Sequence, residues 1–296
     1  SDLKVLRDAY GAKAYINATV RVNKTANVEN NTMDLEFRIL EGQTYYVDLV
    51  KIEGNDKTKD FVIRRELAIS PGEPFDLGRV EKSRRRIEGL RLFLDVGAEQ
   101  QRSGEAGETN EENLLISVRE QNTGRMYFGG GFGSDYGGFG HVVLSQENFD
   151  IGRWRRPHFL QGAGQKIRLR LQAGGRYNDY GLDFEEPWFM GQKLRFTTSL
   201  YARDLQYYSD KFDIEETGGR FGLERALFGN DFLRGNVKFT VENTGLVDVG
   251  SNASTEIKNE AGTDLISQIG VGIAYDTRGG GDLPTTGQRT SFDLDV

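Results

Sequence analysis

Few residues of this chain have the types and spacing that catalysis requires. The chain contains no cysteine and only two histidines, His141 and His158, and neither histidine has a close partner in the sequence. No Ser-His-Asp arrangement can be assembled, and no two carboxylates can be placed together for acid–base work. We therefore predict no enzyme activity, no catalytic residues, no cofactor and no metal site.

The glycine run at residues 129–133 superficially resembles a phosphate-binding loop. No Lys-Ser or Lys-Thr pair follows it and no helix is expected there, so the groups that would hold a nucleotide are missing. In a strand, glycines allow aromatic neighbours to pack and the backbone to curve, but they weaken strand packing. The chemistry that remains is backbone hydrogen bonding, because an exposed strand edge can pair with an incoming chain.

The composition is typical of many strands joined by tight turns. Gly accounts for 38 of the 296 residues, Pro for only 5, and aromatic residues for 11%. The net charge of -7 argues against a nucleic-acid partner. The mean hydropathy is -0.56, and no stretch approaches the roughly 18–20 apolar residues of a membrane helix. A membrane β-barrel is not excluded by that measure, because only every second residue of its strands faces lipid.

The first 42 residues predict one helix and one hairpin. Leu3, Leu6 and Tyr10 follow helical spacing up to Gly11, and alternating strands are expected at 14–23 and 33–40. One helix and one hairpin make a poor independent core, so we expect the C-terminal part of a domain. No signal peptide is visible at Ser1, and we expect a mature or excised segment of an exported protein.

Residues 43–122 predict a complete α+β domain. A strand is expected over 45–53 with Leu49 inward, followed by a short helix capped by Thr58 and a longer helix from Leu77 to Phe93. Two more strands are expected at 94–102 and 113–121, joined by an acidic loop that contains Glu105 and Glu108. The order β-α-α-β-β places helices on one face of a sheet.

Four motifs of this region resemble those of polypeptide-transport-associated (POTRA) domains. They occur in the family's order, and Glu41-Gly42 before them is similar to the junction between consecutive POTRA copies. The motifs are Tyr46 to Asn55 (YVDLVKIEGN), Val62 to Leu67 (VIRREL), Gly72 to Phe75 (GEPF) and Phe93 to Val96 (FLDV). The resemblance implies a complete POTRA domain at 43–122 and the end of an earlier copy at 1–42.

From Thr123 onward the pattern changes to alternation of apolar and polar residues. At 166–174, Ile167, Leu169 and Leu171 alternate with cationic residues, which would be costly to bury in a dry core. The nine expected strands cover 125–133, 139–147, 166–174, 177–185, 193–201, 219–227, 236–242, 268–275 and 291–296. Alternation alone leaves two possibilities open, a transmembrane barrel and a water-soluble β-sandwich or barrel.

Several motifs of this half resemble the barrel of BamA-like outer-membrane assembly factors. They are Thr123 to Gly133, Asn148 to Gly152, Phe184 to Phe189, Tyr275 to Arg278 and Leu283 to Gly287. The resemblance implies that 123–296 is the N-terminal half of an antiparallel transmembrane β-barrel of about nine strands. The family's barrel has sixteen strands, and its Val-Arg-Gly-Phe plug loop and closing strand have no counterpart before Val296.

The resemblance further implies a place in the bacterial outer membrane, with residues 1–122 in the periplasm, and a role in assembling and inserting β-barrel proteins. The implied partners are unfolded outer-membrane proteins, outer-membrane lipid, accessory lipoproteins and periplasmic chaperones, but no nucleic acid. Substrate strands are expected at two edges, through the residues Leu94, Val96, Ala98, Met126, Phe128 and Gly130. Three alternatives stay open: a two-partner secretion transporter, a TamA-like translocation and assembly factor, and a soluble β-rich binding module.

Overall fold

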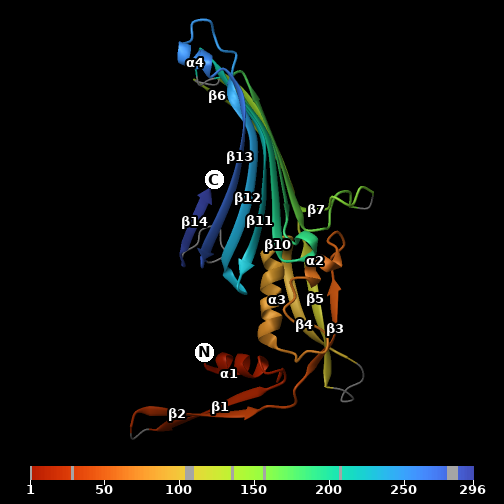
Figure 1. Cartoon of the computed structure of the whole chain (residues 1–296). Coiled ribbons are helices and arrows are strands. Elements are labelled where there is room, and N and C mark those ends of the chain that lie inside the picture. The colour runs from red at the N-terminus through yellow and green to blue at the C-terminus, as the bar shows by residue number, and fades with distance from the viewer. Residues whose placement is uncertain are drawn as a thin grey trace. The chain divides into compact units, whose positions relative to one another are not determined.

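The computed structural model describes residues 2–27, 30–103, 110–134, 137–155, 158–206, 209–278 and 286–296. The chain divides into two compact units, residues 1–121 and 122–296, which we treat separately (Figure 1). Two sequence motifs fall outside the described residues. They are the part of the acidic loop that contains Glu105 and Glu108, and residues 283–285 of the Leu283–Gly287 motif.

The first unit opens with helix α1 (Asp2–Gly11) and a hairpin of β1 (Thr19–Asn27) and β2 (Thr32–Leu40). The hairpin is antiparallel, with Thr19 opposite Leu40. The prediction that its first strand begins at Ala14 was wrong. Ala14 has a φ of 67°, and Ala18 N–H donates to the carbonyl of Tyr15, so residues 12–17 form turns before the strand starts.

The rest of the first unit is a three-stranded sheet covered by two helices. β3 (Tyr46–Glu53), β5 (Glu111–Glu120) and β4 (Phe93–Arg102) lie in the order β3-β5-β4, with β3 parallel and β4 antiparallel to β5. The helices are α2 (Asp60–Arg64) and α3 (Leu77–Gly89). The largest fully buried side chains come from both helices, the sheet and the loops between them: Val47, Val62, Ile63, Ile69, Phe75, Ile87, Leu114 and Ile116.

Two sequence predictions for this domain were wrong. Leu49 is exposed, because the pairing of β3 with β5 shifts register between Val47 and Val50 and both valines face the core. A β-bulge of this kind inserts an extra residue and moves its neighbours to the other face. Thr58 is buried and does not cap α2, whose N-cap residue is Lys59.

Helix α3 has a well-formed start and an early end. The side chain of Asp76 accepts hydrogen bonds from the N–H groups of Gly78 and Arg79, at 2.7 and 3.1 Å, which caps the helix. The helix ends at Gly89 and not at Phe93 as predicted. Arg91 takes a left-handed φ of 57°, and this turn sends Phe93 into β4 with its side chain buried.

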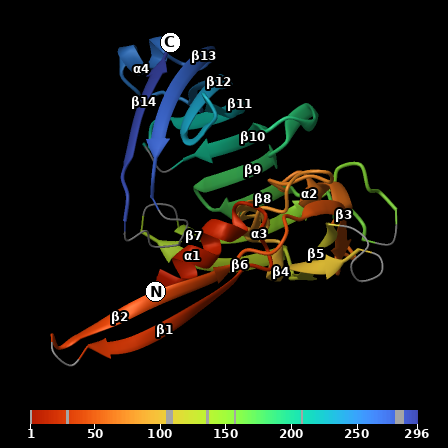
Figure 2. The same cartoon turned by 90° about the horizontal axis from the view of Figure 1, so that it is seen from below.

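The second unit is a single antiparallel sheet of nine strands in sequential order from β6 to β14. Seen from below, the sheet curves around an open concave side (Figure 2). The strands are β6 (Gly124–Gly133), β7 (Gly137–Phe149), β8 (Gln165–Gly174), β9 (Tyr177–Glu186), β10 (Leu194–Leu205), β11 (Asp213–Leu227), β12 (Asn230–Val247), β13 (Gly262–Asp276) and β14 (Arg289–Asp295). The nine predicted strands are confirmed, and β11, β12 and β13 are longer than predicted.

Two short helices connect strands of this sheet. A 3₁₀ turn, η1 (Phe189–Gly191), follows β9, and α4 (Thr255–Asn259) lies between β12 and β13. Neither was predicted from the sequence. Across the described parts of the chain, no helix is long and apolar enough to cross a membrane.

The register aligns apolar residues in rows across the sheet. Leu144 pairs with Leu169, Leu169 with Leu182, and Leu182 with Leu200, so four leucines cross four strands in one line. Leu144, Leu182 and Leu200 are all exposed, and no second sheet layer among the described residues covers them. A soluble sandwich would bury this face against a second sheet, whereas a membrane barrel turns it toward hydrocarbon.

Gly54 and Gly72 allow a matched test of the first unit. Both have left-handed φ values, 87° and 83°, but a Cβ on Gly54 would lie 2.0 Å from the carbonyl oxygen of Val118, whereas a Cβ on Gly72 would have open space. We expect Gly72→Ala to lower the free energy of unfolding by roughly 1–2 kcal/mol, through backbone strain alone. Gly54→Ala should cost roughly 3 kcal/mol or more, since a collision is added. Urea unfolding of segment 1–121 measures both, and equal losses would contradict the steric argument.

Adjacent residues on β8 test the assignment of the two faces of the sheet. Leu171 lies on the apolar face and Gln172 on the opposite face. We expect Leu171→Arg to destabilise the full-length protein in phosphatidylcholine liposomes by roughly 2–4 kcal/mol, the cost of a cation facing mid-bilayer hydrocarbon. Gln172→Arg should cost less than about 1 kcal/mol, because its side chain reaches water. The reverse order in a urea titration would show that the faces are exchanged.

Candidate functional site: two strand edges and the polar face

The first candidate edge is β4, which among the described residues pairs with β5 alone. Of the three residues predicted there, only Leu94 presents its side chain to solvent, at 63% exposure. Val96 is buried in the core, and Ala98 packs against it. Leu94 also lies where the β4–β5 register shifts, between Phe93 and Asp95. Val96 and Ala98 therefore hold β4 against the core and do not face an incoming chain. Such a chain would meet the backbone of β4.

The other edge of this sheet, β3, is covered over its first half. The N–H of Gly72 donates to the carbonyl of Val47 at 2.7 Å, the N–H of Val47 donates to Glu73 at 2.9 Å, and Phe75 donates to Tyr45 at 2.8 Å. Through these hydrogen bonds, residues 72–75 lie along the first half of β3 like a short additional strand. An occupied edge cannot accept another strand. Of the two edges of this sheet, β4 is therefore the more open to a new partner.

The second candidate edge is β6, which pairs only with β7 among the described residues. Met126 and Phe128 are 64% and 79% exposed and lie on the apolar face, opposite Leu144 and Val142. Gly130 follows them on the same face, opposite Gly140. The structure thus gathers the three predicted residues of this strand on one apolar surface beside a free backbone edge.

The other face of β6 shows which aromatic neighbours pack on its glycines, a detail that sequence reasoning did not give. Gly129 lies opposite His141 and Gly131 opposite Phe139, and the two rings of β7 lie side by side with centroids 6.4 Å apart. A Cβ on Gly129 would lie 2.7 Å from Cε1 of His141, and one on Gly131 would lie 2.9 Å from Cζ of Phe139. The glycines therefore make room for aromatic rings that cover the bare backbone. The alternation Phe-x-His facing Gly-x-Gly was the available signal.

The polar face of the sheet carries rows of paired charges. Lys166 contacts Glu185 at 3.0 Å, and Arg195 lies between Glu185 and Glu224 at 3.7 and 3.2 Å. Further pairs join neighbouring strands along the same face: Arg170–Asp183, Arg203–Asp179, Arg203–Glu216 and Arg234–Glu224. Lys238 on β12 reaches across β13 to Asp295 on β14. These partners are partly exposed, so each pair contributes little to stability and the row marks a hydrated surface.

Glycines on the polar face accommodate these long side chains. A Cβ on Gly181 would lie 2.8 Å from the guanidinium of Arg170, and one on Gly270 would lie 2.2 Å from the Lys238 side chain. Gly218 likewise lies beside Tyr201, whose hydroxyl donates to Glu242. Gly181, Gly218 and Gly270 thus provide space for long side chains on the polar face.

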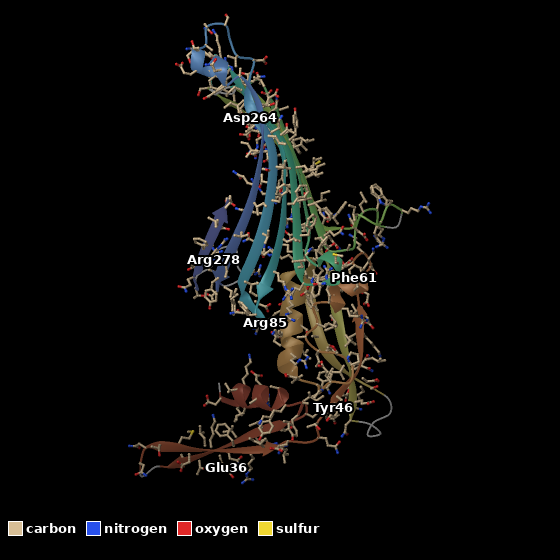
Figure 3. All side chains as sticks on the ribbon, in the orientation of Figure 1. Glu36, Tyr46, Phe61, Arg85, Asp264 and Arg278 are labelled. Carbon is tan, nitrogen blue, oxygen red and sulfur yellow. The ribbon has the colours of Figure 1, made fainter. Side chains whose placement is uncertain are left out.

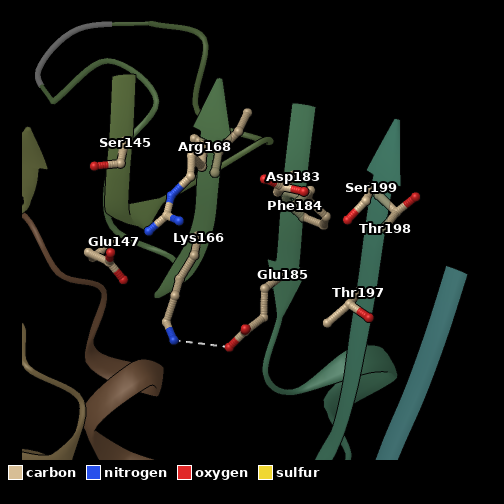
Figure 4. Close-up of a pocket in the computed structure, with 11 residues that line it drawn as sticks. Ser145, Glu147, Lys166, Arg168, Asp183, Phe184, Glu185, Thr197, Thr198 and Ser199 are labelled. Atoms are coloured by element: carbon tan, nitrogen blue, oxygen red, sulfur yellow. Dashed lines mark hydrogen bonds and ion pairs between the residues drawn. The ribbon is translucent and has the colours of Figure 1, made fainter. Parts of the chain in front are cut away.

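A hollow of about 380 Å³ opens near the ends of β8, β9 and β10. Figure 4 shows Arg168 reaching between Ser145 and Asp183, and Lys166 paired with Glu185. Serine and threonine hydroxyls from β7 and β10 complete the lining. Both signs of charge line the hollow, and Lys166 is paired with Glu185 and Asp183 with Arg170, so it is suited to water and backbone polar groups more than to one charged ligand.

Charge pairing also accounts for the arginine run on α3. Arg84 donates two hydrogen bonds to Glu81, at 2.7 and 2.8 Å, and pairs with Glu88; Arg85 also donates to Glu81, at 2.9 Å. The hydrogen bonds from Arg84 lower the pKa of Glu81 to about 2. The helix face is therefore a solvated salt-bridge surface (Arg85 in Figure 3).

The Asp-Arg motif at the end of β13 forms a closed local pair. Arg278 donates to both carboxylate oxygens of Asp276, at 2.7 and 2.9 Å, and its backbone N–H donates to the same side chain at 3.1 Å (Figure 3). A bidentate pair of this kind fixes the chain direction as it leaves the strand. We assign it a structural role at the turn.

Comparison with known families matches both units. Residues 160–296 match the Omp85 superfamily domain, and residues 45–121 match the POTRA family, described as surface antigen variable number repeat. The outer membrane protein assembly factor BamA of Nitratidesulfovibrio vulgaris is 25% identical over 287 residues, which is 97% of this chain and 34% of that protein. BamA of Neorickettsia risticii is 27% identical over 249 residues, covering 81% of this chain and 30% of that protein.

Solved structures show the same fold. BamA from Haemophilus ducreyi lacking POTRA domains 1–3 superposes with a TM-score of 0.73 at 19% identity, covering 100% of this chain and 57% of that one. CdiB from Acinetobacter baumannii reaches a TM-score of 0.52 at 14% identity, covering 96% of this chain and 50% of that one.

The chain spans about a third of the length of the curated relatives it matches. The predicted order, a POTRA module followed by antiparallel barrel strands, is confirmed by both family matches and by the fold. The exposed apolar rows are the outer face of a transmembrane barrel sheet, and the charged rows are its inner face. With its barrel in the outer membrane and residues 1–122 in the periplasm, this chain is BamA-like: a POTRA module is followed by strands that match the Omp85 superfamily domain.

Proposed function

We propose that this chain takes part in folding other β-barrel proteins and inserting them into the outer membrane. The observation that carries the proposal is strand β6, which pairs with β7 alone among the described residues and carries exposed Met126 and Phe128 beside glycines that weaken its packing. An incoming strand that pairs there satisfies its own N–H and C=O groups and adds its apolar side chains to the same face. The BamA relatives carry the name of outer membrane protein assembly factors, which supports the proposal.

The β4 edge is the proposed first contact for the substrate. An unfolded chain in the periplasm gains backbone hydrogen bonds by adding to an open sheet edge. Such pairing depends little on the sequence of the unfolded chain. Leu94 supplies an exposed apolar contact at the bulged end of this edge. Loose selectivity suits a module that receives many different unfolded outer-membrane proteins, and the proposed role needs no catalytic residue.

We assign residues 1–42 to the end of an earlier POTRA copy and residues 43–122 to a complete one, followed by the barrel from residue 123. The order α1, β1, β2 repeats the order α3, β4, β5 that ends the complete domain. In the hairpin, Met33, Leu35 and Phe37 are exposed, so its apolar face needs a partner from the same domain. We also place accessory lipoproteins and periplasmic chaperones among the partners, through the exposed surfaces of these modules.

A two-partner secretion transporter is the second candidate. The CdiB fold match and the charged inner face favour it, because a polypeptide in transit needs a hydrated path. The superposition on BamA is closer, with a TM-score of 0.73 against 0.52, and it extends over the whole chain. We therefore rank assembly and insertion first. A TamA-like factor shares the same edge chemistry and stays within this proposal.

Photocrosslinking separates the two candidates. We expect a photoreactive residue at Phe128 of the full-length protein to crosslink a nascent barrel substrate, because the substrate strand pairs along β6. Leu200 is the matched control, since it is exposed on the same apolar face but lies on the central strand β10. Ser199, on the inner face, reports a passing polypeptide. Products at Ser199 with none at Phe128 would favour the transporter and remove the insertion proposal.

The rings over β6 should control how readily its seam opens. We expect His141→Ala combined with Phe139→Ala to speed amide hydrogen exchange of β6 about fivefold, because a cross-strand pair contributes up to about 1 kcal/mol. Val142→Ala on the opposite face is the control and removes apolar contact without uncovering Gly129 or Gly131. An equal increase in exchange for the control would mean that the rings have no special part in holding the seam.

A further inference from the structure

The connection from β7 to β8 stands out from the other strand connections. It runs from Asp150 to Gly164 and is described over residues 150–155 and 158–164. Ile151, Trp154 and Phe159 are 54%, 67% and 54% exposed. Large apolar side chains on a loop in water need a partner that covers them. The connection therefore presents three apolar side chains and no covering element in the part of the chain that the structure describes.

The loop is built to hold these side chains in place. Asn148, buried at its base, accepts the N–H of Gly164 on its side chain at 2.9 Å and the N–H of Gly162 on its carbonyl, also at 2.9 Å. Asp150 N–H donates to the carbonyl of Leu160 at 3.0 Å, and Leu160 N–H donates to Arg153 at 2.7 Å. These bonds draw the two arms together, so the loop loses little entropy when a surface receives it.

Its backbone also depends on a glycine with an unusual φ. Gly162 has a φ of 123°, a value that other residues rarely adopt, and it returns the chain to β8. At the other arm the side chain of Gln165 accepts the N–H of Ile151 at 2.8 Å. The start of the apolar segment is thus fixed to the first residue of β8. These internal hydrogen bonds hold the loop in one conformation.

The position of the loop indicates what covers it. β6 enters the sheet from residue 123, and Gly124 pairs with Gln146, so the end of β7 lies at the periplasmic end of the barrel. Both views show the segment after β7 projecting away from the concave side of the sheet, on the outer, lipid-facing side (Figures 1 and 2). The apolar side chains therefore continue the hydrocarbon-facing surface of β7 toward the membrane boundary.

Other connections at the same end carry the same kind of side chain. Met190, in the connection after β9, is 82% exposed, and Phe228, in the turn after β11, is 93% exposed. Aromatic and large apolar residues at the ends of barrel strands mark the level of the lipid head groups. These two turns follow strands other than β7 and independently place the periplasmic membrane surface at the level of the loop.

The loop also carries cationic groups beside its apolar ones. Arg153 and Arg155 flank Trp154, and Arg155 is exposed. Nη1 of Arg153 donates to the carbonyl of Gln161 at 3.3 Å, which ties this arginine to the opposite arm. A guanidinium beside an aromatic ring suits the boundary where lipid phosphates meet acyl chains. Arginine beside tryptophan therefore favours a leaflet that contains anionic lipid over a purely apolar partner.

We propose that the β7–β8 connection is an interfacial anchor that binds the periplasmic leaflet of the membrane. Ile151, Trp154 and Phe159 enter the upper acyl region, and Arg155 binds lipid phosphate. The anchor fixes the depth of the barrel wall next to β6, the strand whose free edge is proposed to receive substrate. The lipid contact itself does not depend on that assembly role and can be tested without it.

The test places an environment-sensitive label at Trp154. The full-length protein carries Trp154→Cys labelled with nitrobenzoxadiazole and is reconstituted in liposomes of phosphatidylethanolamine and phosphatidylglycerol. Lipids with a spin label at a shallow acyl position should quench its emission at least twofold more than that of the same label at Ser251→Cys, in the connection between β12 and β13 at the opposite end. Blue-shifted emission without lipid quenching would mean that protein covers the loop and would overturn the proposal.

A charge variant tests the phosphate contact separately. Quenching at position 154 should be stronger in liposomes with phosphatidylglycerol than in pure phosphatidylcholine, and Arg155→Gln should remove that difference while leaving the basal quenching. Equal quenching in both lipids before the substitution would overturn the phosphate contact. Failure of either measurement leaves crosslinking at Phe128 unaffected, so loss of the anchor and loss of the assembly function can be told apart.

Discussion

The structure of the barrel half depends on one requirement: in hydrocarbon every backbone N–H and C=O group must find a partner within the protein. Interior strands β7 to β13 meet it through two neighbours each. The edge strands β6 and β14 have one neighbour each among the described residues, so the outer backbone groups of both can accept a further strand. The requirement that stabilises the wall thus also makes its edges reactive toward other strands.

The same pairing decides where every side chain points. Because successive residues of a strand face opposite ways, one register puts the leucine row from Leu144 to Leu200 on the outside and the row of Lys166 and Glu185 on the inside. Charged partners on adjacent strands reinforce that register without contributing much stability individually. Glycines such as Gly181 give the long inner side chains room to reach across. The register, the charge pairs and the positions of the glycines all follow from the alternation of apolar and polar residues along each strand.

Strands were predicted accurately where apolar and polar residues alternate along the whole segment. The alternation at Ile167, Leu169 and Leu171 located β8 to within a residue, because a one-residue error would exchange lipid-facing and water-facing side chains. The ends of β11, β12 and β13 were missed. The missed end of β11 is mostly polar, and in the missed ends of β12 and β13 apolar residues stand next to each other, as at Phe232-Leu233 and Leu265-Ile266, which breaks the alternation. The β4 edge was found by family resemblance, and the β6 edge by resemblance together with its glycine content. Aromatic packing on those glycines was predicted, but not that Phe139 and His141 supply the rings.

The failures in the POTRA domain have a different origin. Leu49 was predicted to face inward because side chains alternate along a strand. A β-bulge between Val47 and Val50 interrupts that alternation and leaves Leu49 exposed. Thr58 has the chemistry of a cap, but it lies one residue before the true N-cap Lys59, and its own N–H donates to Glu120 at 2.7 Å. Both errors arise where a contact with a distant strand overrides the local pattern. Such contacts are invisible until the sheet order is known.

The glycines of β6 combine two opposing physical effects in a single strand. Glycine lowers strand stability through backbone entropy and the lack of a side chain to pack, which favours an edge that separates from its neighbour. The rings of Phe139 and His141 return part of that stability by covering Gly129 and Gly131 from the inner face. Phe128, on the outer face, has no such cover and remains available to an incoming strand. A strand that is held from inside and open on its outer edge can exchange partners while the wall behind it stays paired.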